Sequence, residues 1–571
     1  MPGFFVSNCD IDIQLKNLYP DRCVEQSLEL PNTTLKRNTL DKFMDDKAFS
    51  ATENAVLVLD GVLLNKKQLF GRYSVDDVAH LMWEMYVQKG DTFFADFRGP
   101  FSGVLYDRKN NRWIVFTNHI GDAAVYCAYA DGCLFAGSQV NYVLDAMREC
   151  KIAISFNESA AYQMLTFGFM EDNDTYANEI HRLQGGTYLC IENGEANIRE
   201  YHRFRKNAER FSGKTEDEIV DELDEAFRVA SALEYEKDDE YGYRHLVDIS
   251  GGLDSRMNMW VAHKIQPRHM QLMTYSKANY LDERIAKQVA AFWNDELLVK
   301  TLDDASYLYD IDDIVFMNGG LSLYSGITGG KRMLESMNAD VFGIEHTGQI
   351  NGAIIGSYYR KMENGKGVAG LGMFSEKLKH RLAGSTLDKY DDYELYALYT
   401  RGFRGIMNTQ QIRRNFAEAI TTTSDTDFLQ LCMDIPVEMR VEHKLYKRWI
   451  VSKYPEAAKF RWEKTGGKIT EGALLTKFRR IVTKGPLKLL RILSMHRYIN
   501  TGMNPLDYWV SKNNHLRAFM DEYEATGYQH MPMQASQQLI DDMKYLYRTG
   551  NVNEKAMVLT VLASVKLYFG D

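Results

Sequence analysis

The sequence predicts an α+β domain with antiparallel sheets, followed by an α/β domain with a parallel sheet and a helical C-terminal part. Three observations support this fold class. The 571 residues exceed the roughly 100–200 that one domain usually takes. Between residues 55 and 205 short apolar runs alternate with turns, as in β-hairpins. From residue 246 to 293, strand, turn and helix follow one another twice, which is typical of a parallel sheet covered by helices.

The first region contains short apolar runs at 55–59, 113–116 and 124–127, each bounded by a turn. β-branched and aromatic residues in such runs favour strands, and residues 76–88 are expected to be helical. Residues 206–218 are polar and lack strong periodicity, so we place the boundary there. This predicts domains at 1–205 and 216–571.

The second region opens with helical spacing over 216–233. A buried strand is expected at 246–249, followed by a glycine turn and a helix. A second strand is expected at 270–276 and a second helix at 282–293.

Composition is that of a globular protein, with 45% hydrophobic and 26% charged residues. Lys and Arg total 68 against 78 Asp and Glu, giving a net charge of −10. This balance predicts no nucleic-acid partner. The sequence shows neither a signal-peptide pattern nor an apolar run long enough for a membrane span, so we expect a cytoplasmic protein.

Seven cysteines are scattered along the chain, without any CxxC spacing. An odd number at low density predicts reduced thiols, rather than a disulfide framework or a zinc site.

The clearest chemical motif is SGGLDSR at residues 250–256, directly after the strand expected at 246–249. Glycines permit a tight turn and close backbone approach to a ligand. The next helix would present its N–H groups and dipole to an anion. Asp254 is suited to hold a metal ion against phosphate oxygens. The alternative is a plain glycine-rich turn at a strand end.

This run resembles the SGGxDS loop of N-type ATP pyrophosphatases, which cleave ATP between the α and β phosphates. Two other glycine-containing segments are treated as chance matches to phosphate loops. Residues 466–469 (GGKI) lack the spacing of a Walker loop, and residues 365–370 (GKGVAG) follow no expected strand.

Over nearly the whole chain the order of short motifs is similar to that of the asparagine synthetase family, which includes β-lactam synthetase. The matching first-domain segments are 60–65 (DGVLLN), 97–102 (FRGPFS), 121–126 (GDAAVY), 135–138 (FAGS) and 185–189 (GGTYL). The resemblance implies an N-terminal-nucleophile-like sandwich domain, followed by an ATP-pyrophosphatase domain of the adenine nucleotide α-hydrolase-like type.

Position 2 departs from the resembled family, in which a cysteine follows the initiator methionine and attacks glutamine. Here the residue is Pro2, which has no thiol. We therefore expect the first domain not to hydrolyse glutamine.

The second domain also departs from the family pattern. Residues 347–358 (TGQINGAIIGSY) resemble SGEGADELFGGY, but Gln349, Gly352 and Ala353 replace acidic residues. Asn351 or Glu345 are alternative oxygen ligands. Asp282 and Glu283 resemble a family DE pair, although acids also favour a helix N-terminus through its dipole.

Residues 464–467 (KTGG) resemble the segment that carries the family's catalytic lysine, with Lys468 as the rival position. The resemblance implies catalytic roles for Lys464 and Asp254, and a metal ligand in Asp254. For ATP and pyrophosphate it implies Ser250, Gly251, Gly252, Asp254, Ser255, Ser276 and Gly348. For substrate it offers Arg256, Gln349 and Asn351; Arg256 is equally suited to a core ion pair.

The function implied is an ATP-dependent, amide-forming ligase that uses ATP and Mg²⁺ to adenylate a small carboxylate and transfers it to ammonia or an amine. The missing acidic residues motivate the alternative, a non-catalytic nucleotide-binding or scaffold protein. A glutamine-dependent synthetase is disfavoured by Pro2. Residues 477–497 contain seven basic and no acidic residues, which fits either an anionic or lipid-linked partner or a solvated helix face.

Overall fold

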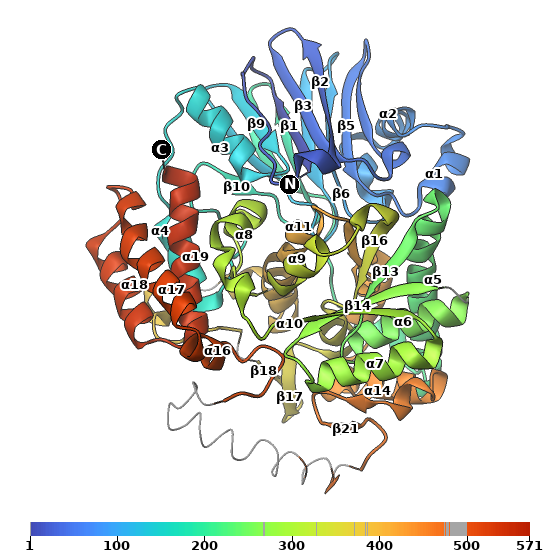
Figure 1. Cartoon of the computed structure of the whole chain (residues 1–571). Helices are drawn as coiled ribbons and strands as arrows, with labels where there is room; N and C mark the ends of the chain where they lie inside the picture. Colours follow the sequence, from blue (N-terminus) through green and yellow to red (C-terminus); the bar gives the residue numbers. More distant parts are fainter. Residues whose placement is uncertain are drawn as a thin grey trace.

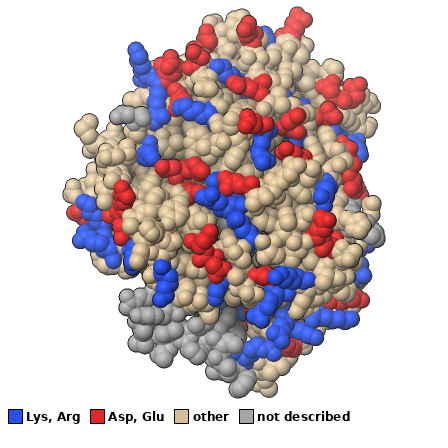
Figure 2. Space-filling model, in the orientation of Figure 1, with Lys and Arg blue, Asp and Glu red and all other residues tan. Residues whose placement is uncertain are grey.

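The computed structural model describes residues 2–266, 269–326, 328–370, 372–382, 384, 386–472, 474–475, 479 and 499–570. Within these residues the main architecture consists of two six-stranded antiparallel sheets and one five-stranded parallel sheet (Figure 1). Acidic and basic side chains are interspersed over the face shown in Figure 2.

The antiparallel sheets lie face to face in the N-terminal part of the chain. The first sheet has the strand order β10-β8-β9-β1-β3-β2 and the second β12-β11-β7-β6-β5-β4. The strands of the first sheet are β1 (Gly3–Ser7), β2 (Cys23–Leu30), β3 (Thr33–Leu40), β8 (Tyr126–Ala130), β9 (Cys133–Gly137) and β10 (His181–Arg182). Those of the second are β4 (Ala48–Ala51), β5 (Ala55–Gly61), β6 (Phe101–Asp107), β7 (Arg112–Thr117), β11 (Thr187–Glu192) and β12 (Glu195–Glu200).

Alternation along these strands builds the sandwich core. Val56 and Val58 of β5 pack with Phe4 and Val6 of β1 between the sheets, whereas the residues between them face outward to helices. Helices α1 (Lys66–Tyr73) and α2 (Val78–Lys89) cover the second sheet, and α3 (Val140–Glu149) and α4 (Glu158–Phe167) cover the first. The first region is thus an α/β sandwich, in agreement with the strand-rich pattern.

The parallel sheet has the strand order β15-β14-β13-β16-β19. Its strands are β13 (Arg244–Asp248), β14 (Met270–Ser276), β15 (Glu296–Thr301), β16 (Phe342–Thr347) and β19 (Glu418–Thr421). The chain proceeds outward from β13 through β14 to β15 and then returns to the other side of β13 with β16. This reversal creates a topological switch point between β13 and β16, and open α/β sheets bind ligands at the carboxyl ends of the strands at such a point.

Helices cover both faces of the parallel sheet. Val247 and Leu272 face the core formed with α5 (Glu216–Tyr241), α6 (Asp254–Ile265) and α7 (Leu281–Trp293). Leu246 and Met273 face the opposite side, toward α9 (Thr328–Glu335). Further helices surround this layer: α8 (Ile311–Asn318), α10 (Tyr393–Ala397), α11 (Gln410–Arg413), α12 (Thr426–Asp434), α13 (Val437–Arg440) and α14 (Lys444–Lys453).

The last helices return to the N-terminal sandwich. These are α16 (Leu506–Lys512), α17 (Asn514–Gly527), α18 (Gln537–Thr549) and α19 (Val552–Phe569). They share one hydrophobic core with α3, α4 and α8 (Figure 1). The Tyr162 hydroxyl donates to Asp542 at 3.0 Å, and Glu158 accepts hydrogen bonds from Ser536. The C-terminal helices are therefore packed against the helices of the N-terminal sandwich.

Most element predictions agree with the structure. The strand expected at 270–276 is β14 (Met270–Ser276), and the helix expected at 282–293 is α7 (Leu281–Trp293). The GKGVAG segment belongs to a hairpin of β17 (Tyr359–Glu363) and β18 (Lys366–Ala369), which supports its treatment as a chance match. Among the described residues no helix has the length and apolarity needed to cross a bilayer.

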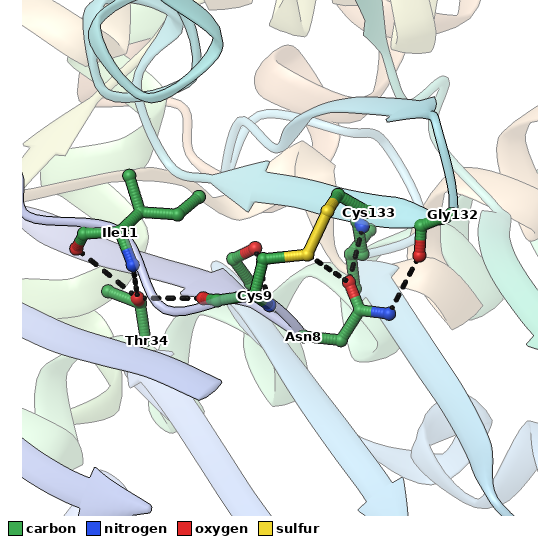
Figure 3. Close-up of a disulfide and its surroundings, with 8 residues drawn as sticks. Asn8, Cys9, Ile11, Thr34, Gly132 and Cys133 are labelled. Carbon is green, nitrogen blue, oxygen red and sulfur yellow. Dashed lines mark hydrogen bonds between the residues drawn. A yellow bond between two sulfur atoms is a disulfide. The ribbon is translucent and has the colours of Figure 1, made fainter. Parts of the chain in front are cut away.

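The structure corrects the prediction of reduced thiols for two cysteines. Cys9 and Cys133 form a disulfide with their Cα atoms 5.9 Å apart, although 124 positions separate them (Figure 3). Strands β1 and β9 are antiparallel neighbours, so the residues just beyond their ends come together. Asn8 joins the same strands by donating to the Gly132 carbonyl at 3.0 Å. Sequence spacing alone does not reveal this proximity, and because disulfides persist in oxidising compartments, cysteine usage here no longer argues for a reducing one.

Candidate functional site

A cavity of about 250 Å³ lies at the carboxyl ends of β13, β14 and β16. This is the switch point of the parallel sheet, where the topology favours a ligand site. Three carboxylates and one guanidinium are among its lining side chains: Asp248, Asp254, Asp282 and Arg413. The formal balance of these four groups is negative, which favours a ligand that brings a cation with it.

The loop that follows β13 forms one wall of the cavity. The Ser255 hydroxyl accepts from the Ser250 N–H at 3.0 Å, and the two hydroxyl oxygens are 3.0 Å apart. The Ser250 hydroxyl also accepts from the Gly252 N–H at 3.1 Å. Both predicted serines line the cavity, and their hydroxyls close the loop on itself.

Helix α6 begins at this loop with its N-terminus at the cavity. Its N-cap residue, Leu253, provides no side-chain cap, and the first N–H groups of a helix have no partner within the helix. The helix dipole places partial positive charge at the same point. This end of α6 is therefore suited to bind an anion.

Asp254, the first residue of α6, is half-buried and lines the cavity. Burial raises its pKa to about 6, opposed by the backbone N–H of Gly352 and the charge of Lys464. The carboxylate is therefore largely ionised at neutral pH and titrates under mildly acidic conditions.

Gly348 marks the crossing of the loops that follow β13 and β16. A Cβ atom at this position would lie 2.3 Å from the Ser255 nitrogen and 2.6 Å from the Asp254 carbonyl carbon. Backbone atoms cannot move aside as a flexible side chain can, so this approach requires glycine. The prediction from sequence placed Gly348 at the site, and the structure shows it lining the cavity.

The sequence analysis missed Arg413, at the end of α11. Its guanidinium donates to Asp248 at 3.0 Å and to the Tyr275 hydroxyl at 2.6 Å, and it also pairs with Glu345. Burial disfavours its charge, but Asp248 and Tyr275 together outweigh this effect and raise the pKa of Arg413. Because Arg413 and Asp248 are 165 positions apart, no local motif indicates their pairing.

Asp282 supports the loop from α7. Its carboxylate accepts from the Gly251 N–H at 2.9 Å, and burial raises its pKa to about 6. Asp282 also lies in the first turn of α7, where the helix dipole favours an acidic residue. The alternative role expected for it therefore applies as well. Its neighbour Glu283 pairs instead with Lys287 on the same helix.

Lys464 is exposed and is not among the residues that line the cavity. It occupies the turn between β20 (Arg461–Trp462) and β21 (Gly467–Lys468). Its Nζ is 2.9 Å from Nε2 of His443. Burial, followed by the charge of Lys464, lowers the pKa of His443 to about 4. The same charge lowers the pKa of Asp254, so Lys464 and Asp254 are electrostatically coupled.

Two residues offered for substrate have structural contacts instead. Arg256 is fully buried and donates to the carbonyls of Gly251, Ala457 and Arg461. This corrects the predicted ion pair in the core, because the partners of Arg256 among the described residues are carbonyls rather than a carboxylate. Asn351 is fully buried, and its side-chain oxygen accepts from Thr421 and Thr423.

The remaining predicted residues differ in their access to the cavity. Gln349 lines it and donates to the Thr409 hydroxyl at 3.2 Å. The Ser276 hydroxyl donates to the Lys277 carbonyl at 3.1 Å, and Ser276 is not among the cavity-lining residues. Thr274, two positions earlier on β14, lines the cavity in its place.

Oxygen atoms at the cavity provide a test of whether a cation fits. Asp248 Oδ1 and Gln349 Oε1 are buried without a hydrogen-bond partner among the described residues. Together with Asp254 they offer the hard oxygen donors that Mg²⁺ prefers. A Cβ at Gly352 would lie 2.8 Å from Asp254 Oδ2, so a carboxylate at that position would face Asp254. The residues present thus fit a divalent cation, since Asp254 and Asp282 both line the cavity and neither has an ion pair among the described residues.

The predicted basic segment 477–497 lies outside the described residues, except for Arg479. Arg479 pairs with Glu471 at 2.6 Å.

Comparisons with known proteins identify relatives of part of the chain. Residues 43–202 match the glutamine amidotransferase domain family. Asparagine synthetase B [glutamine-hydrolyzing] of Escherichia coli strain K12 is 23% identical over 242 residues, which cover 40% of this chain and 36% of that protein. The match therefore spans about a third of that relative's length.

Two solved structures show weak overall similarity to this chain. The allosteric regulatory enzyme of purine biosynthesis is 9% identical, with a TM-score of 0.23, over 52% of this chain and 74% of that one. Glutamine phosphoribosylpyrophosphate amidotransferase from B. subtilis, complexed with ADP and GMP, is 8% identical, with a TM-score of 0.23, over 64% and 82%. The family match and the sequence relative support a relation to glutamine amidotransferases and asparagine synthetase B.

Proposed function

We propose that this protein is an ATP-dependent ligase that adenylates a small carboxylate and joins it to ammonia or an amine. The observation that carries this proposal is the cavity at the switch point, where the uncapped N-terminus of α6 and Asp254 meet. The relation to asparagine synthetase B supports the reaction class. The ATP-pyrophosphatase character of the second domain is part of this proposal.

The α6 N-terminus and the loop at 250–255 would bind the β and γ phosphates of ATP. Asp254, with the free oxygens of Asp248 and Gln349, would hold the Mg²⁺ that accompanies them. Bound Mg²⁺ supplies charge neutralisation on the phosphate oxygens. The cavity of about 250 Å³ is smaller than the roughly 300–1,000 Å³ of ligand pockets, which suits the phosphates better than a whole nucleotide.

Two displacement steps complete the reaction. The substrate carboxylate attacks the α-phosphorus, the bond to the oxygen bridging to the β-phosphorus breaks, and pyrophosphate leaves. The amine nitrogen then attacks the acyl carbon, AMP leaves with the bonding electrons, and the nitrogen loses a proton. Lys464, coupled electrostatically to Asp254, would stabilise the negative charge that develops in both steps.

The nitrogen donor follows from Pro2. Since proline offers no nucleophile at the position of the resembled family's catalytic cysteine, we propose that free ammonia or a substrate amine replaces glutamine. Release of glutamate from glutamine by the purified protein would contradict this part of the proposal.

ATP–pyrophosphate exchange with a panel of small carboxylates tests the ligase directly. At least one carboxylate is expected to support exchange, and Asp254→Asn is expected to reduce it by about 100-fold or more. The matched control is Asp77→Asn, at the exposed N-cap of α2 in the first domain, which should exchange at the wild-type rate. Exchange at an unchanged rate in Asp254→Asn would show that the site is wrongly assigned.

Gly352 favours a second candidate function, a nucleotide-binding scaffold without catalysis. No side chain faces Asp254 from this position, so the metal site lacks the acidic residue that the resembled family has there. Calorimetry with Mg²⁺-ATP separates the two functions. Saturable binding without exchange on any carboxylate would favour the scaffold, whereas exchange would exclude it.

A further inference from the structure

A second polar cluster lies inside the molecule, between the parallel sheet and α5. His245 belongs to β13 and His346 to β16; both contact Asp238 of α5, and His346 also contacts Glu234 of the same helix. The side chains of His346 and Asp238 are fully buried, and those of His245 and Glu234 are at most 6% exposed. Neither the proposed ligase reaction nor the family match uses these residues.

Three potential ligand atoms converge in this cluster. Asp238 Oδ2 is 3.1 Å from His245 Nδ1 and 3.0 Å from His346 Nε2. All three atoms lie within 4.8 Å of one another. Two ligand atoms that are each about 2.1 Å from a tetrahedral zinc ion are about 3.4 Å apart, which lies between the 3.0 Å contact and the 4.8 Å limit in this cluster. The spacing therefore matches a coordination shell with two histidines and one carboxylate.

The other nitrogen of each histidine ring contacts a further carboxylate. His346 Nδ1 is 3.2 Å from Glu234 Oε2, and His245 Nε2 is 3.3 Å from Asp239 Oδ1. Metal-binding histidines almost always use their second nitrogen in this way, which fixes the tautomer and the ring orientation. Asp238 is oriented as well, since its Oδ1 accepts from the Ile344 N–H at 2.9 Å.

Charge balance also favours a cation. Glu234 and Asp238 have no Lys or Arg ion pair among the described residues, and their ionic partners are the two histidines. Lys237, the adjacent cation on α5, pairs with Asp46 and Glu240. Lys42, near Asp238, donates to the carbonyls of Ala339, Phe342 and Phe416. Buried carboxylates are costly unless they are paired or bind a metal.

We propose that His245, His346 and Asp238 bind a divalent transition-metal ion, best represented by Zn²⁺, which ties α5 to β13 and β16. Imidazole suits Zn²⁺ and related ions, and two histidines with one carboxylate form an established zinc-binding set. The ion would lie between α5 and the strands β13 and β16, which lead to the 250–255 and 348–352 loops. Its role is to hold in place the sheet that positions the cavity.

The experiment measures the metal in the full chain, purified without an affinity tag that binds metal. Elemental analysis is expected to find about one ion per chain, or the chelator-treated protein is expected to bind about one Zn²⁺ or Co²⁺ in titration. His346→Gln is expected to lose this binding, and Glu234→Gln to weaken it by about 10–100-fold. Chelation should lower Tm in the wild type only, because an ion that binds the native state stabilises it.

Two matched controls separate this site from other histidine–carboxylate groups. His263→Gln alters another buried histidine, which pairs with Asp295 at 2.7 Å and stacks on Trp293, and should leave metal binding unchanged. His80→Gln alters the exposed cluster of Asp76, Asp77 and His80 and should also be neutral.

Where His346→Gln fails to fold, His245→Gln and the Co²⁺ absorption of the wild type provide the readout, since histidine-bound Co²⁺ in a site of low symmetry has a characteristic visible spectrum. The proposal is overturned if the wild-type protein neither contains metal nor binds Co²⁺ or Zn²⁺. In that case protons, not a metal ion, link the histidines to the carboxylates. Equal binding by the wild type and the histidine variants overturns it too. These measurements require no nucleotide, so their outcome is independent of the ligase proposal.

Discussion

At the scale of single residues, Asp254 combines two properties that oppose each other. It is a carboxylate at the N-terminus of α6 without an ion pair among the described residues, and burial raises its pKa to about 6. A carboxylic acid with this pKa is ionised at neutral pH, but the protein stabilises its charged form less well than water does. Sites that bind cations keep such groups at a cost in stability.

We expect Asp254→Asn to abolish Mg²⁺-dependent nucleotide binding without lowering Tm at pH 7.5. The folded-state pKa lies above the unfolded value of about 3.9. The native state therefore gains stability from protonation at low pH, and this gain is lost as pH rises from about 4 to about 6. Asparagine removes this dependence, so Tm of the variant should equal or exceed that of the wild type, by about 1–3 °C. Differential scanning calorimetry across pH 4–8 measures the Tm of the variant and of the wild type.

The same titration affects binding. Affinity of the wild type for Mg²⁺-ATP should fall as pH decreases through about 6, where Asp254 becomes protonated. A binding constant that stays flat from pH 5 to 8 would contradict the assignment of Asp254 as the metal ligand.

Gly348→Ala is expected to lower stability by about 1–3 kcal/mol, the usual effect of overpacking, and to displace the 250–255 loop. The added Cβ would meet the Ser255 nitrogen at 2.3 Å. Gly71→Ala is the matched control, because nothing lies within 4 Å of a Cβ there and the position is inside α1. The control should gain about 0.5–1 kcal/mol. Chemical denaturation of both variants gives the comparison; equal stability of the two would show that the loops do not cross tightly.

At the scale of elements, the site depends on how short segments meet rather than on any one of them. The loop after β13, the loop after β16 and the single turn of α11 come from positions about 250, 350 and 410. The first was identified from its glycines and hydroxyls, and the second from its resemblance to a family motif. The third carries Arg413, which no sequence motif indicates. The structure identifies it by its ion pairs with two carboxylates, the half-buried Asp248 and the buried Glu345, on adjacent parallel strands.

We expect Arg413→Met to destabilise the protein by about 3–5 kcal/mol, because it leaves two buried carboxylates unpaired. Arg72→Met is the control, since Arg72 is mostly exposed and pairs with Asp96 at the surface. That change should cost no more than about 1 kcal/mol. Thermal unfolding distinguishes them, and a small effect at Arg413 would mean that Asp248 and Glu345 are not held as ions.

The extent of α5 shows where hydrophobic periodicity stops being informative. The apolar spacing predicts a helix over 216–233, whereas α5 continues to Tyr241. Its last two turns bury Glu234, Lys237 and Asp238, which a hydrophobic pattern assigns to the surface. Their partners lie on other elements: Asp46 for Lys237, and the two histidines for Asp238 and Glu234. Burial of paired charges is decided by tertiary contacts.

At the scale of the whole molecule, the N-terminal sandwich is linked to the parallel-sheet layer at several points. Asp122, in the loop after β7, pairs with Arg414 at 2.8 Å, next to the cavity residue Arg413. Helices α18 and α19 pack against α3 and α4. The predicted division at about residue 205 therefore separates two sheet systems in sequence but does not separate two independent bodies.

The Cys9–Cys133 disulfide closes a long loop within the sandwich, and we expect Cys9→Ser to lower its stability by about 2–4 kcal/mol. Cys23→Ser is the matched control, since Cys23 is a half-buried free cysteine on the same sheet. Thermal unfolding with and without dithiothreitol should show a lower Tm for reduced wild type and no effect of the reductant on Cys9→Ser. Equal sensitivity of both proteins to dithiothreitol would argue against this bridge as the relevant bond.

The sequence by itself determined the strand-rich first region, the strand–loop–helix order of the second and the loop with Ser250, Asp254 and Ser255. These features depend on local rules: side-chain periodicity, turn residues and helix ends. Only the tertiary structure decided that Arg256 and Asn351 serve the core, that Arg413 enters the cavity, that Cys9 meets Cys133 and that two histidines meet Asp238. Each of these depends on contacts between strands or helices far apart in the chain, and no local pattern specifies such contacts.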